Sequence, residues 1–395
     1  MFNKKELKVA LVHDFLVEFG GAERVLKTLS EMFPTAPIYT LLSEKEKFPD
    51  WLKNKKVEVS FLQKWPRFLR NRKKWLLPFL PVAPETFNLR DFDLIISSSG
   101  AWSKGIVTRL DTIHISYLHS PMRFAWDMNG EYSRQQNKGG IINFFSRYML
   151  NYIRLWDFAA ADRPEYLIAN SHYTKDRIKK YYNREAPVIY PPVSPHEALR
   201  TDSPVFANKA SGAAVKKEKY FLVVSRLSAY KKIDVVVEAF NKLELPLVIV
   251  GIGDQEKYLK SIAGKNIKFL GFQPDAELSK IYDGARCFIF PALDDFGIAP
   301  VEAMSHGVPV IGLRMGGMRE ILLEGRTGEF FDSVTSEIVA DGVRRFRENE
   351  GSYSKEVIMA RAKEFSEEKF IRELEIFIDT IYENLGKQEN RRFVE

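Results

Sequence analysis

Two carboxylates with the chemistry to bind sugar hydroxyls, Asp294 and Glu302, stand eight positions apart. Asp294 follows the apolar run 287–290, which has strand length, so it lies just past the carboxyl end of a predicted strand. Pro300 suits a first helical turn and Gly307 a helix end, which predicts a short helix with Glu302 near its start. Because ligands of open α/β sheets bind outside the carboxyl ends of the strands, we expect both acids to face one crevice.

A pair of glycines, Gly316 and Gly317, follows a second predicted strand over 308–312. Their missing side chains let backbone amides approach an anion such as phosphate at the start of the next helix. Each feature alone has a plainer interpretation: Glu302 and Glu320 could complement helix dipoles, and the glycines could form an ordinary turn. Their joint order favours a ligand site.

Two cations, Arg226 and Lys231, lie on one loop after a predicted strand that ends at Val224. Together they could clamp a diphosphate, with the guanidinium acting as a fork and the ammonium as a point charge. A surface loop with several cations is the alternative.

The first part of the chain has polar residues at similar positions. His13 and Asp14 end the first predicted strand, Gly20 and Gly21 follow, and His119 ends a later strand. A histidine at a strand end can take part in chemistry or be a hydrogen-bonded structural residue, and both interpretations stay open here.

The composition is that of a large protein without a disulfide framework. A chain of 395 residues with 45% hydrophobic content exceeds one compact core, so two domains are expected. The single cysteine, Cys287, lies in an apolar run and fits a reducing compartment. The apolar run 9–12 is too short for a signal peptide, and no uninterrupted apolar stretch of about 18 residues predicts a spanning helix.

Short apolar runs alternate with helical periods in two successive arrays. The first array has predicted strands over 7–12, 94–97, 113–118, 166–169 and 188–190, and the second over 221–224, 247–250, 267–270, 287–290 and 308–311. This pattern predicts an α/β protein with two doubly wound parallel sheets. We expect a first domain over 1–195, a linker over 196–217, a second domain over 218–369, and an amphipathic helix and tail over 370–395.

The net charge of +7 is uneven. The segment Trp51 to Leu80 has nine Lys or Arg residues against one acid, Glu58, interleaved with aromatic and aliphatic residues. Such a segment is typical of a surface that binds an anionic bilayer. There are two alternatives, a solvated helix face and a basic groove for an acidic ligand, and together they have the same weight as the bilayer interpretation. Nucleic acid is not expected, because no nucleic-acid motif accompanies the charge.

The order of motifs resembles the retaining glycosyltransferases of family four, whose GT-B architecture has two facing Rossmann-like domains and a C-terminal helix that returns to the first. The matching segments are Gly20-Gly21, His119-Ser120-Pro121, Ile168-Ala169-Asn170-Ser171, Tyr190-Pro191-Pro192-Val193, Ser225-Arg226-Leu227 with Lys231, Gly251-Ile252-Gly253, Asp294 with Glu302, and Gly316-Gly317 with Glu320. They span nearly the whole chain, and their ordered set is specific although each alone is weak.

The resemblance implies a role for each matched residue. Glu302 would bind the ribose hydroxyls of the nucleotide, and Arg226 and Lys231 would neutralise the departing diphosphate. Asp294 and His119 would lie against the transferring sugar. The further donor-binding residues would be Gly20, Gly21, Ser225, Gly251, Gly297, Ile298, Gly316, Gly317 and Glu320.

One position departs from the family pattern. Glu is usual at the first acidic position, whereas this chain has Asp294 followed by Asp295. The shorter side chain would reach a sugar hydroxyl only if its loop moved inward. We predict no metal and no cofactor, because two adjacent acids without further ligand spacing do not indicate a cation site.

Two segments, 117–127 and 295–298, are similar to a subgroup of mannosyltransferases. This implies GDP-mannose as donor, with a UDP-sugar as the alternative. The expected acceptor is a lipid-linked glycan in surface polysaccharide or glycolipid synthesis. We expect a cytoplasmic protein, attached peripherally to the inner face of the membrane if the basic segment binds lipid.

Two other classes of protein share features with this chain. A nicotinamide dehydrogenase would share the βα pattern, but Gly251-Ile252-Gly253 lacks the third glycine of its fingerprint. A catalytically silent protein that binds sugar nucleotides stays open, because its residues would overlap with those of an enzyme.

Overall fold

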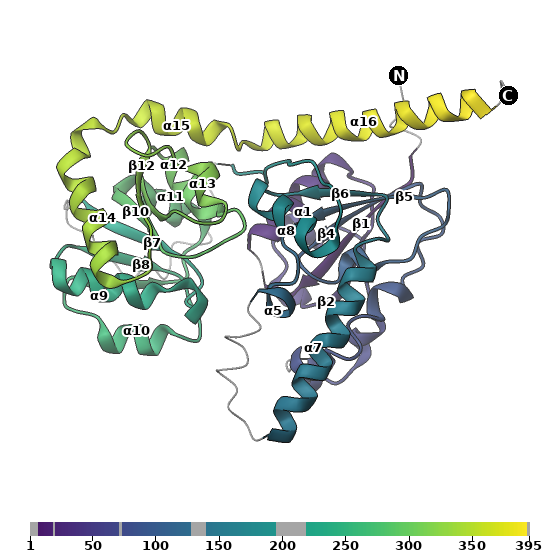
Figure 1. Cartoon of the computed structure of the whole chain (residues 1–395), viewed down its shortest axis with the longest axis horizontal. Helices are drawn as coiled ribbons and strands as arrows, with labels where there is room; N and C mark the ends of the chain where they lie inside the picture. The colour runs from purple at the N-terminus through teal and green to yellow at the C-terminus, as the bar shows by residue number, and fades with distance from the viewer. Residues whose placement is uncertain (1–6, 19, 71–72, 128–139, 195–218, 393–395) are drawn as a thin grey trace. The chain divides into compact units, whose positions relative to one another are not determined.

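The computed structural model describes residues 7–18, 20–70, 73–127, 140–194 and 219–392. The chain divides into two compact units; Figure 1 shows the first in purple to teal together with the yellow C-terminal helix, and the second in green to yellow-green. The first unit consists of Met1–Pro192 and Glu368–Glu395, and the second of Val193–Glu367. The expected linker, 196–217, lies outside the described residues.

The first unit contains a parallel sheet of six strands in the order β3-β2-β1-β4-β5-β6. The strands are β1 (Val9–Leu16), β2 (Ile38–Ser43), β3 (Val57–Val59), β4 (Leu94–Ser99), β5 (Ile113–Leu118) and β6 (Tyr166–Ala169). The helices are α1 (Gly21–Met32), α2 (Asp50–Lys53), α3 (Arg67–Arg70), α4 (Lys73–Leu76), α5 (Arg123–Trp126), α7 (Gly140–Ala160) and α8 (His172–Tyr182). The strand order reverses between β1 and β4, which is where ligands of such sheets bind.

The second unit repeats this topology, with the order β12-β11-β10-β7-β8-β9. Its strands are β7 (Tyr220–Val224), β8 (Leu247–Val250), β9 (Ile267–Gly271), β10 (Ala285–Phe290), β11 (Val310–Leu313) and β12 (Gly328–Phe331). Its helices are α9 (Ile233–Leu243), α10 (Glu256–Ile262), α11 (Asp275–Gly284), α12 (Ile298–Ser305), α13 (Met318–Ile321), α14 (Ser336–Asn349) and α15 (Lys355–Lys363). The order reverses between β7 and β10.

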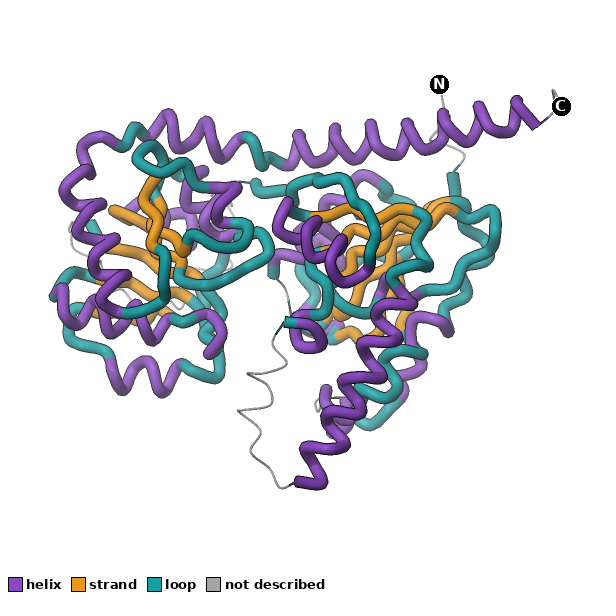
Figure 2. The backbone as a smooth tube through the Cα atoms, in the orientation of Figure 1, coloured by secondary structure: helices purple, strands orange, loops and turns teal. Residues whose placement is uncertain are grey.

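Helices enclose the strands of each unit (Figure 2), and β4, β5, β8 and β11 are buried along their whole length. The last helix, α16 (Glu367–Arg392), contributes to the core of the first unit. Its buried residues Phe370, Leu374, Ile378 and Ile381 pack there with residues of β1, β4 and β5. The predicted α/β class, the two doubly wound sheets and the return of the last helix are therefore confirmed.

The boundaries of some strands differ from the prediction. β1 continues to Leu16, because Phe15 and Leu16 pair with Leu42 and Ser43 of β2. The prediction that the strand ends before His13 was wrong, since His13 lies inside it.

Two further predictions were inaccurate. The strand expected over 188–190 is a single bridge between Val188 and Ala169. β11 begins at Val310 rather than at residue 308, where the amide of Val308 bonds instead to the carbonyl of Ala303 in the preceding helix. Pro309 has no amide hydrogen to donate to a ladder.

Candidate active site

The switch point of the second sheet holds an ion pair between two predicted site residues. Lys231 ends a short 3-10 turn after β7, and Asp294 lies in the loop after β10. The Nζ atom of Lys231 donates to Oδ2 of Asp294, and both side chains are mostly buried. The same ammonium lies 5.2 Å from the ring centroid of Tyr230 and 5.8 Å from that of Phe290. A cation and an acid are thus held together at the edge where ligands of this fold bind.

The glycine pair packs directly on the loop of this acid. Gly316 has a φ of +62°, and a Cβ there would stand 2.3 Å from the carbonyl oxygen of Asp294. The amide of Gly317 donates to that same oxygen at 3.1 Å. A Cβ on Gly317 would lie 2.4 Å from the Cα of Phe296. Only glycine fits at both positions, because the two loops touch through their backbones.

The loop after β7 is built against Gly251 in a similar way. Gly251 has a φ of +129°, and a Cβ there would stand 1.9 Å from the carbonyl oxygen of Ser225. Arg226, the next residue, is exposed. This close packing fixes the backbone from which Arg226 projects.

Glu302 is more enclosed than its position suggested. It lies on α12, which begins with Ile298 just after Gly297, and it is 3% exposed. Its Oε2 accepts a hydrogen bond of 3.0 Å from the hydroxyl of Tyr282 on α11. Glu320 lies in the first turn of α13 and is half-buried. The two acids therefore differ in access: the side chain of Asp294 is partly exposed, and Glu302 is buried against Tyr282.

In the first unit, the loop that carries His119 is held by Asn170 of a matched motif and by Arg177 of α8. The side-chain amide of Asn170, just past β6, donates to the carbonyl of His119 at 2.9 Å. Arg177 of α8 donates to Ser120 Oγ at 2.7 Å and to the carbonyl of Pro121 at 3.2 Å. The segments 119–121 and 168–171 are thus one structural assembly.

The ring of His119 is held by a serine that the sequence did not single out. Its Nε2 lies 2.8 Å from the hydroxyl of Ser98, which lies in turn 3.1 Å from Nδ1 of His13. Desolvation, with a smaller contribution from His13, lowers the pKa of His119 to about 4. The imidazole is therefore neutral at neutral pH.

Gly20 and Gly21 stand at the start of α1. Gly20 has extended backbone with room for a Cβ, so its conformation does not require glycine. Its amide donates to Oε2 of Glu23 at 2.7 Å. The signal for Glu23 was present in the sequence, because an acid three residues after a helix start is a common capping residue.

Asp14 shapes the adjoining loop after β4. Its two carboxylate oxygens accept hydrogen bonds from the backbone amides of Gly100, Trp102 and Ser103, at 2.9, 2.9 and 2.7 Å. Three amide donors satisfy this buried acid, so its role in the structure is that of a loop cap.

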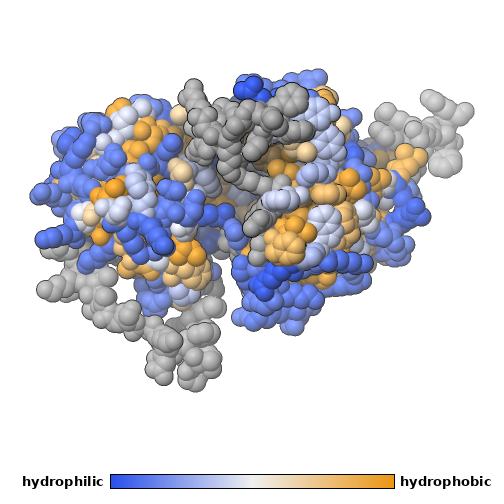
Figure 3. Space-filling view, turned by 90° about the horizontal axis from the view of Figure 1, so that it is seen from below, coloured by the Kyte–Doolittle hydropathy of each residue, from blue (hydrophilic) through white to orange (hydrophobic). Residues whose placement is uncertain are grey.

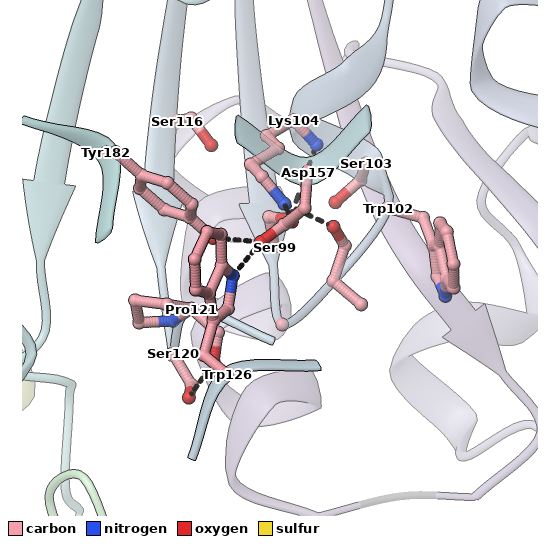
Figure 4. A network of polar contacts seen from close by, with 12 residues as sticks. Ser99, Trp102, Ser103, Lys104, Ser116, Ser120, Pro121, Trp126, Asp157 and Tyr182 are labelled. Carbon is pink, nitrogen blue, oxygen red and sulfur yellow. Dashed lines mark hydrogen bonds and ion pairs between the residues drawn. The ribbon is translucent and has the colours of Figure 1, made fainter. Parts of the chain in front are cut away.

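A buried ion pair anchors α7 beneath the same edge of the sheet (Figure 4). The ammonium of Lys104 lies 2.5 Å from Oδ1 of Asp157, and both side chains are inaccessible to solvent. Oδ2 of Asp157 accepts from the indole of Trp126 at 2.7 Å and from the hydroxyl of Tyr182 at 2.8 Å. One carboxylate therefore joins α5, α7 and α8.

His114 is a core residue. It is fully buried in β5, where its Nε2 lies 2.8 Å from the hydroxyl of Ser97. Desolvation and the charge of Arg184 lower its pKa to about 3. Across the described ranges, no three His, Cys, Asp or Glu side chains gather as metal ligands would.

The basic segment and α7 expose aromatic residues around one buried cluster. Phe68, Trp75 and Phe79 are exposed beside the exposed cations Lys64 and Arg67. Leu62, Leu76 and Leu80 of this segment pack with Ile153 of α7 in the core. Among the described side chains of α7, the exposed large hydrophobic residues are Tyr148, Tyr152, Leu155 and Phe158. Figure 3 shows hydrophobic and hydrophilic residues side by side on the face of the first unit turned to the viewer.

Among the helices that the structure describes, none has both the length and the apolar character needed to cross a bilayer.

Two family models match the chain. The model described as "Glycosyltransferase Family 4" matches residues 19–197, and the model "Glycosyl transferases group 1" matches residues 204–364.

Curated relatives include an uncharacterized glycosyltransferase of Methanocaldococcus jannaschii, 32% identical over 39% of this chain and 41% of its own length. The chain thus spans less than half of that relative. The alpha-1,3/1,6-mannosyltransferase ALG2 of Dictyostelium discoideum is 23% identical over 82% of this chain and 86% of its own. The GDP-mannose-dependent alpha-mannosyltransferase of Corynebacterium glutamicum is 31% identical over 35% of each chain.

Among solved structures, Anabaena HepE in complex with UDP-glucose has a TM-score of 0.67 and 19% identity, covering 95% of this chain and 100% of HepE. At this identity the likeness shows a shared fold.

Proposed function

Because the chain belongs to glycosyltransferase family 4, we propose that it transfers a hexose from a nucleotide sugar to a glycan acceptor. The observation that carries this proposal is the pair of Lys231 and Asp294 at the switch point of the second sheet, beside the backbone of Gly316. A cation beside exposed Arg226 suits a departing diphosphate, and the acid suits a sugar hydroxyl.

The proposed reaction is retaining and proceeds without a metal. Arg226 and Lys231 offset the charge that develops on the diphosphate, and Glu302 binds the ribose hydroxyls. His119 contacts the transferring sugar. No protein base is assigned, because the leaving phosphate can take the acceptor proton on the face from which it departs.

Mannose from GDP-mannose is the favoured donor. The names of two relatives, ALG2 and the corynebacterial enzyme, support mannosyl transfer, and the second specifies GDP-mannose. A UDP-sugar is the alternative, because HepE was solved with UDP-glucose.

The proposed acceptor is a lipid-linked glycan of a surface polysaccharide or glycolipid. Exposed Phe68 and Trp75 beside Arg67 support attachment to an anionic bilayer. Sedimentation with vesicles of phosphatidylcholine and phosphatidylserine should show binding that weakens with salt and with the change of these three residues to Ser, Ser and Gln. Leu110→Ser, at an exposed leucine in the turn before β5, is the matched control. If binding depends neither on the salt concentration nor on the triple change, the proposed attachment to an anionic bilayer is wrong.

Donor choice is tested first by thermal shift with a panel of GDP- and UDP-sugars, because a ligand of the native state raises the unfolding temperature. Turnover of the selected donor is then compared for the natural protein, Lys231→Met and Glu302→Gln. Lys242→Met, which removes an exposed pair with Glu337 on the same unit, is the control. We expect at least a tenfold loss of kcat/KM in both site variants and no change in the control. Donor binding without any turnover would favour a silent binding protein, and unchanged turnover in both variants would falsify the site.

A further inference from the structure

Four polar side chains form a continuous hydrogen-bonded row across the switch point of the first sheet. Oε1 of Glu23 lies 3.3 Å from Nε2 of His13, Nδ1 of His13 lies 3.1 Å from the hydroxyl of Ser98, and that hydroxyl lies 2.8 Å from Nε2 of His119. The residues come from α1, β1, β4 and the end of β5. His13 and Ser98 are buried, and His119, at the far end, is partly exposed.

The chemistry of the groups fixes the direction of this row. An ionised carboxylate only accepts hydrogen bonds, so Nε2 of His13 carries a proton. When His13 is neutral, its Nδ1 is an acceptor and receives a hydrogen bond from the hydroxyl of Ser98. The oxygen of Ser98 then accepts from Nε2–H of His119, which leaves Nδ1 of His119 without a proton.

One additional proton on His13 reverses the direction of the hydrogen bonds from His13 through Ser98 to His119. When Nδ1 of His13 is also protonated, it donates to Ser98, and Ser98 donates to Nε2 of His119. The neutral ring of His119 must then carry its proton on Nδ1. The free nitrogen of His119 thus changes from an acceptor to a donor without any change in the charge of that ring.

The second ring nitrogen of His119 is not engaged by the row. Within the described residues, Nδ1 of His119 has no hydrogen-bond partner, while Nε2 is engaged by Ser98. The lowered pKa of His119, about 4, keeps its ring neutral in both states of the row.

Ionised Glu23 is favoured despite its burial. Desolvation opposes its charge, but hydrogen bonds from His13 and from the amides of Gly20 and Glu23 itself outweigh this and lower its pKa. Asp14, the other acid that acts on His119, is engaged by three backbone amides of the neighbouring loop.

The same carboxylate also holds the glycine loop. Its second oxygen, Oε2, accepts the 2.7 Å hydrogen bond from the amide of Gly20, while Oε1 engages His13. Glu23 therefore joins the start of α1 to the row that ends at His119.

We propose that Glu23 is a positioning residue that, through His13 and Ser98, sets which hydrogen-bonding state His119 presents to a sugar hydroxyl. The inference rests on the proposed function for the identity of the ligand, but the order of protons in the row does not depend on it. With His13 neutral, Nδ1 of His119 accepts a hydrogen bond from the sugar hydroxyl, and with His13 protonated it donates a hydrogen bond to that hydroxyl.

The first test needs no substrate. Nitrogen-15 NMR of the histidine rings in the whole chain reports the proton position of His13 and His119 as a function of pH. We expect His119 to carry its proton on Nε2 at high pH and to transfer it to Nδ1 as His13 gains its second proton. Glu23→Gln should alter the nitrogen-15 signals of the His13 ring, and Ser98→Ala should leave His119 as a mixture of tautomers. The exposed variant Glu31→Gln, on the same helix, should change neither.

The second test uses turnover of the donor selected by thermal shift. Glu23→Gln should lower kcat at least tenfold, change KM for the donor by less than threefold, and displace the acidic limb of the pH profile. An Nδ1 proton on His119 while His13 is neutral, or a Glu23→Gln variant with unaltered ring signals, would overturn the proposal. If the natural protein transfers no sugar, the proposed function fails, and the NMR result still decides the order of the row.

Discussion

Lys231 and Asp294 form an ion pair between the loops that follow β7 and β10, the two strands at which the order of the second sheet reverses. The acid at this position of the family pattern is usually the longer Glu. In this chain the shorter Asp294 already reaches the cation, so its carboxylate neutralises the ammonium before any ligand binds.

We expect Asp294→Asn to separate binding from turnover. Without the carboxylate, the ammonium of Lys231 is no longer neutralised, so the nucleoside diphosphate of the preferred donor should bind two- to tenfold more tightly. The acid that we propose to contact the sugar is lost, so kcat should fall at least tenfold. Isothermal calorimetry and steady-state rates measure the two effects, and Asp294→Glu, which keeps the charge, is the control. Weaker binding by Asp294→Asn would contradict this account.

Gly316→Ala should destabilise the protein more than Gly325→Ala. Both glycines have positive φ, +62° and +72°, but a Cβ on Gly325 meets nothing within 4 Å. Gly325→Ala therefore pays only the backbone strain, about 1 kcal/mol, whereas Gly316→Ala adds the clash with the carbonyl of Asp294 and should cost about 2–4 kcal/mol. Urea unfolding compares the two, and equal losses would show that the contact relaxes freely.

Removal of one partner of the buried pair should be costly. Lys104→Met leaves the carboxylate of Asp157 buried without its cation, for which a loss of about 3–5 kcal/mol in the free energy of unfolding is expected. The double variant Lys104→Met with Asp157→Asn should lose at least about 1 kcal/mol less than the two single losses together. Lys27→Met, which removes an exposed pair with Glu31, should change stability far less. Strict additivity would argue against coupling of the pair.

The stability should fall as the pH is lowered from 7 to 5. The unfolded chain protonates His114 near pH 6.5, whereas desolvation and Arg184 lower the pKa of the folded side chain to about 3. The unfolded state therefore binds more protons between these values, and this one group should account for about 2 kcal/mol between pH 7 and pH 5. Urea unfolding at several pH values measures the slope, which should be shallower in His114→Gln. An equal slope in the variant would assign the effect to other groups.

The sequence predicted elements best where a strand is fully buried. The run 113–118 is β5 residue for residue, since its apolar stretch is bounded by polar turns. His119 was therefore placed correctly at a strand end. Ser98 was not predicted as a site residue. Serines at the end of a strand have no characteristic spacing, so the sequence does not distinguish a serine that bonds to a histidine ring from an ordinary surface serine.

The two strands on one side of the first sheet, β2 and β3, were harder to predict. β2 was not predicted, and its pairing with Phe15 and Leu16 is what extends β1 beyond the expected end. β3, with the half-exposed pattern of Val57-Glu58-Val59, carries little periodic signal of its own. A strand end depends on its neighbour, and in a parallel sheet the neighbour is distant in sequence.

The packing of α16 has a consequence for the order in which the protein can fold during synthesis. Phe370, Leu374, Ile378 and Ile381 belong to the core of the first unit, although the ribosome makes them after the whole second unit. The second unit is continuous over Val193–Glu367 and can complete its core while translation still runs. The first unit therefore keeps part of its core exposed until α16, the last helix, has been translated.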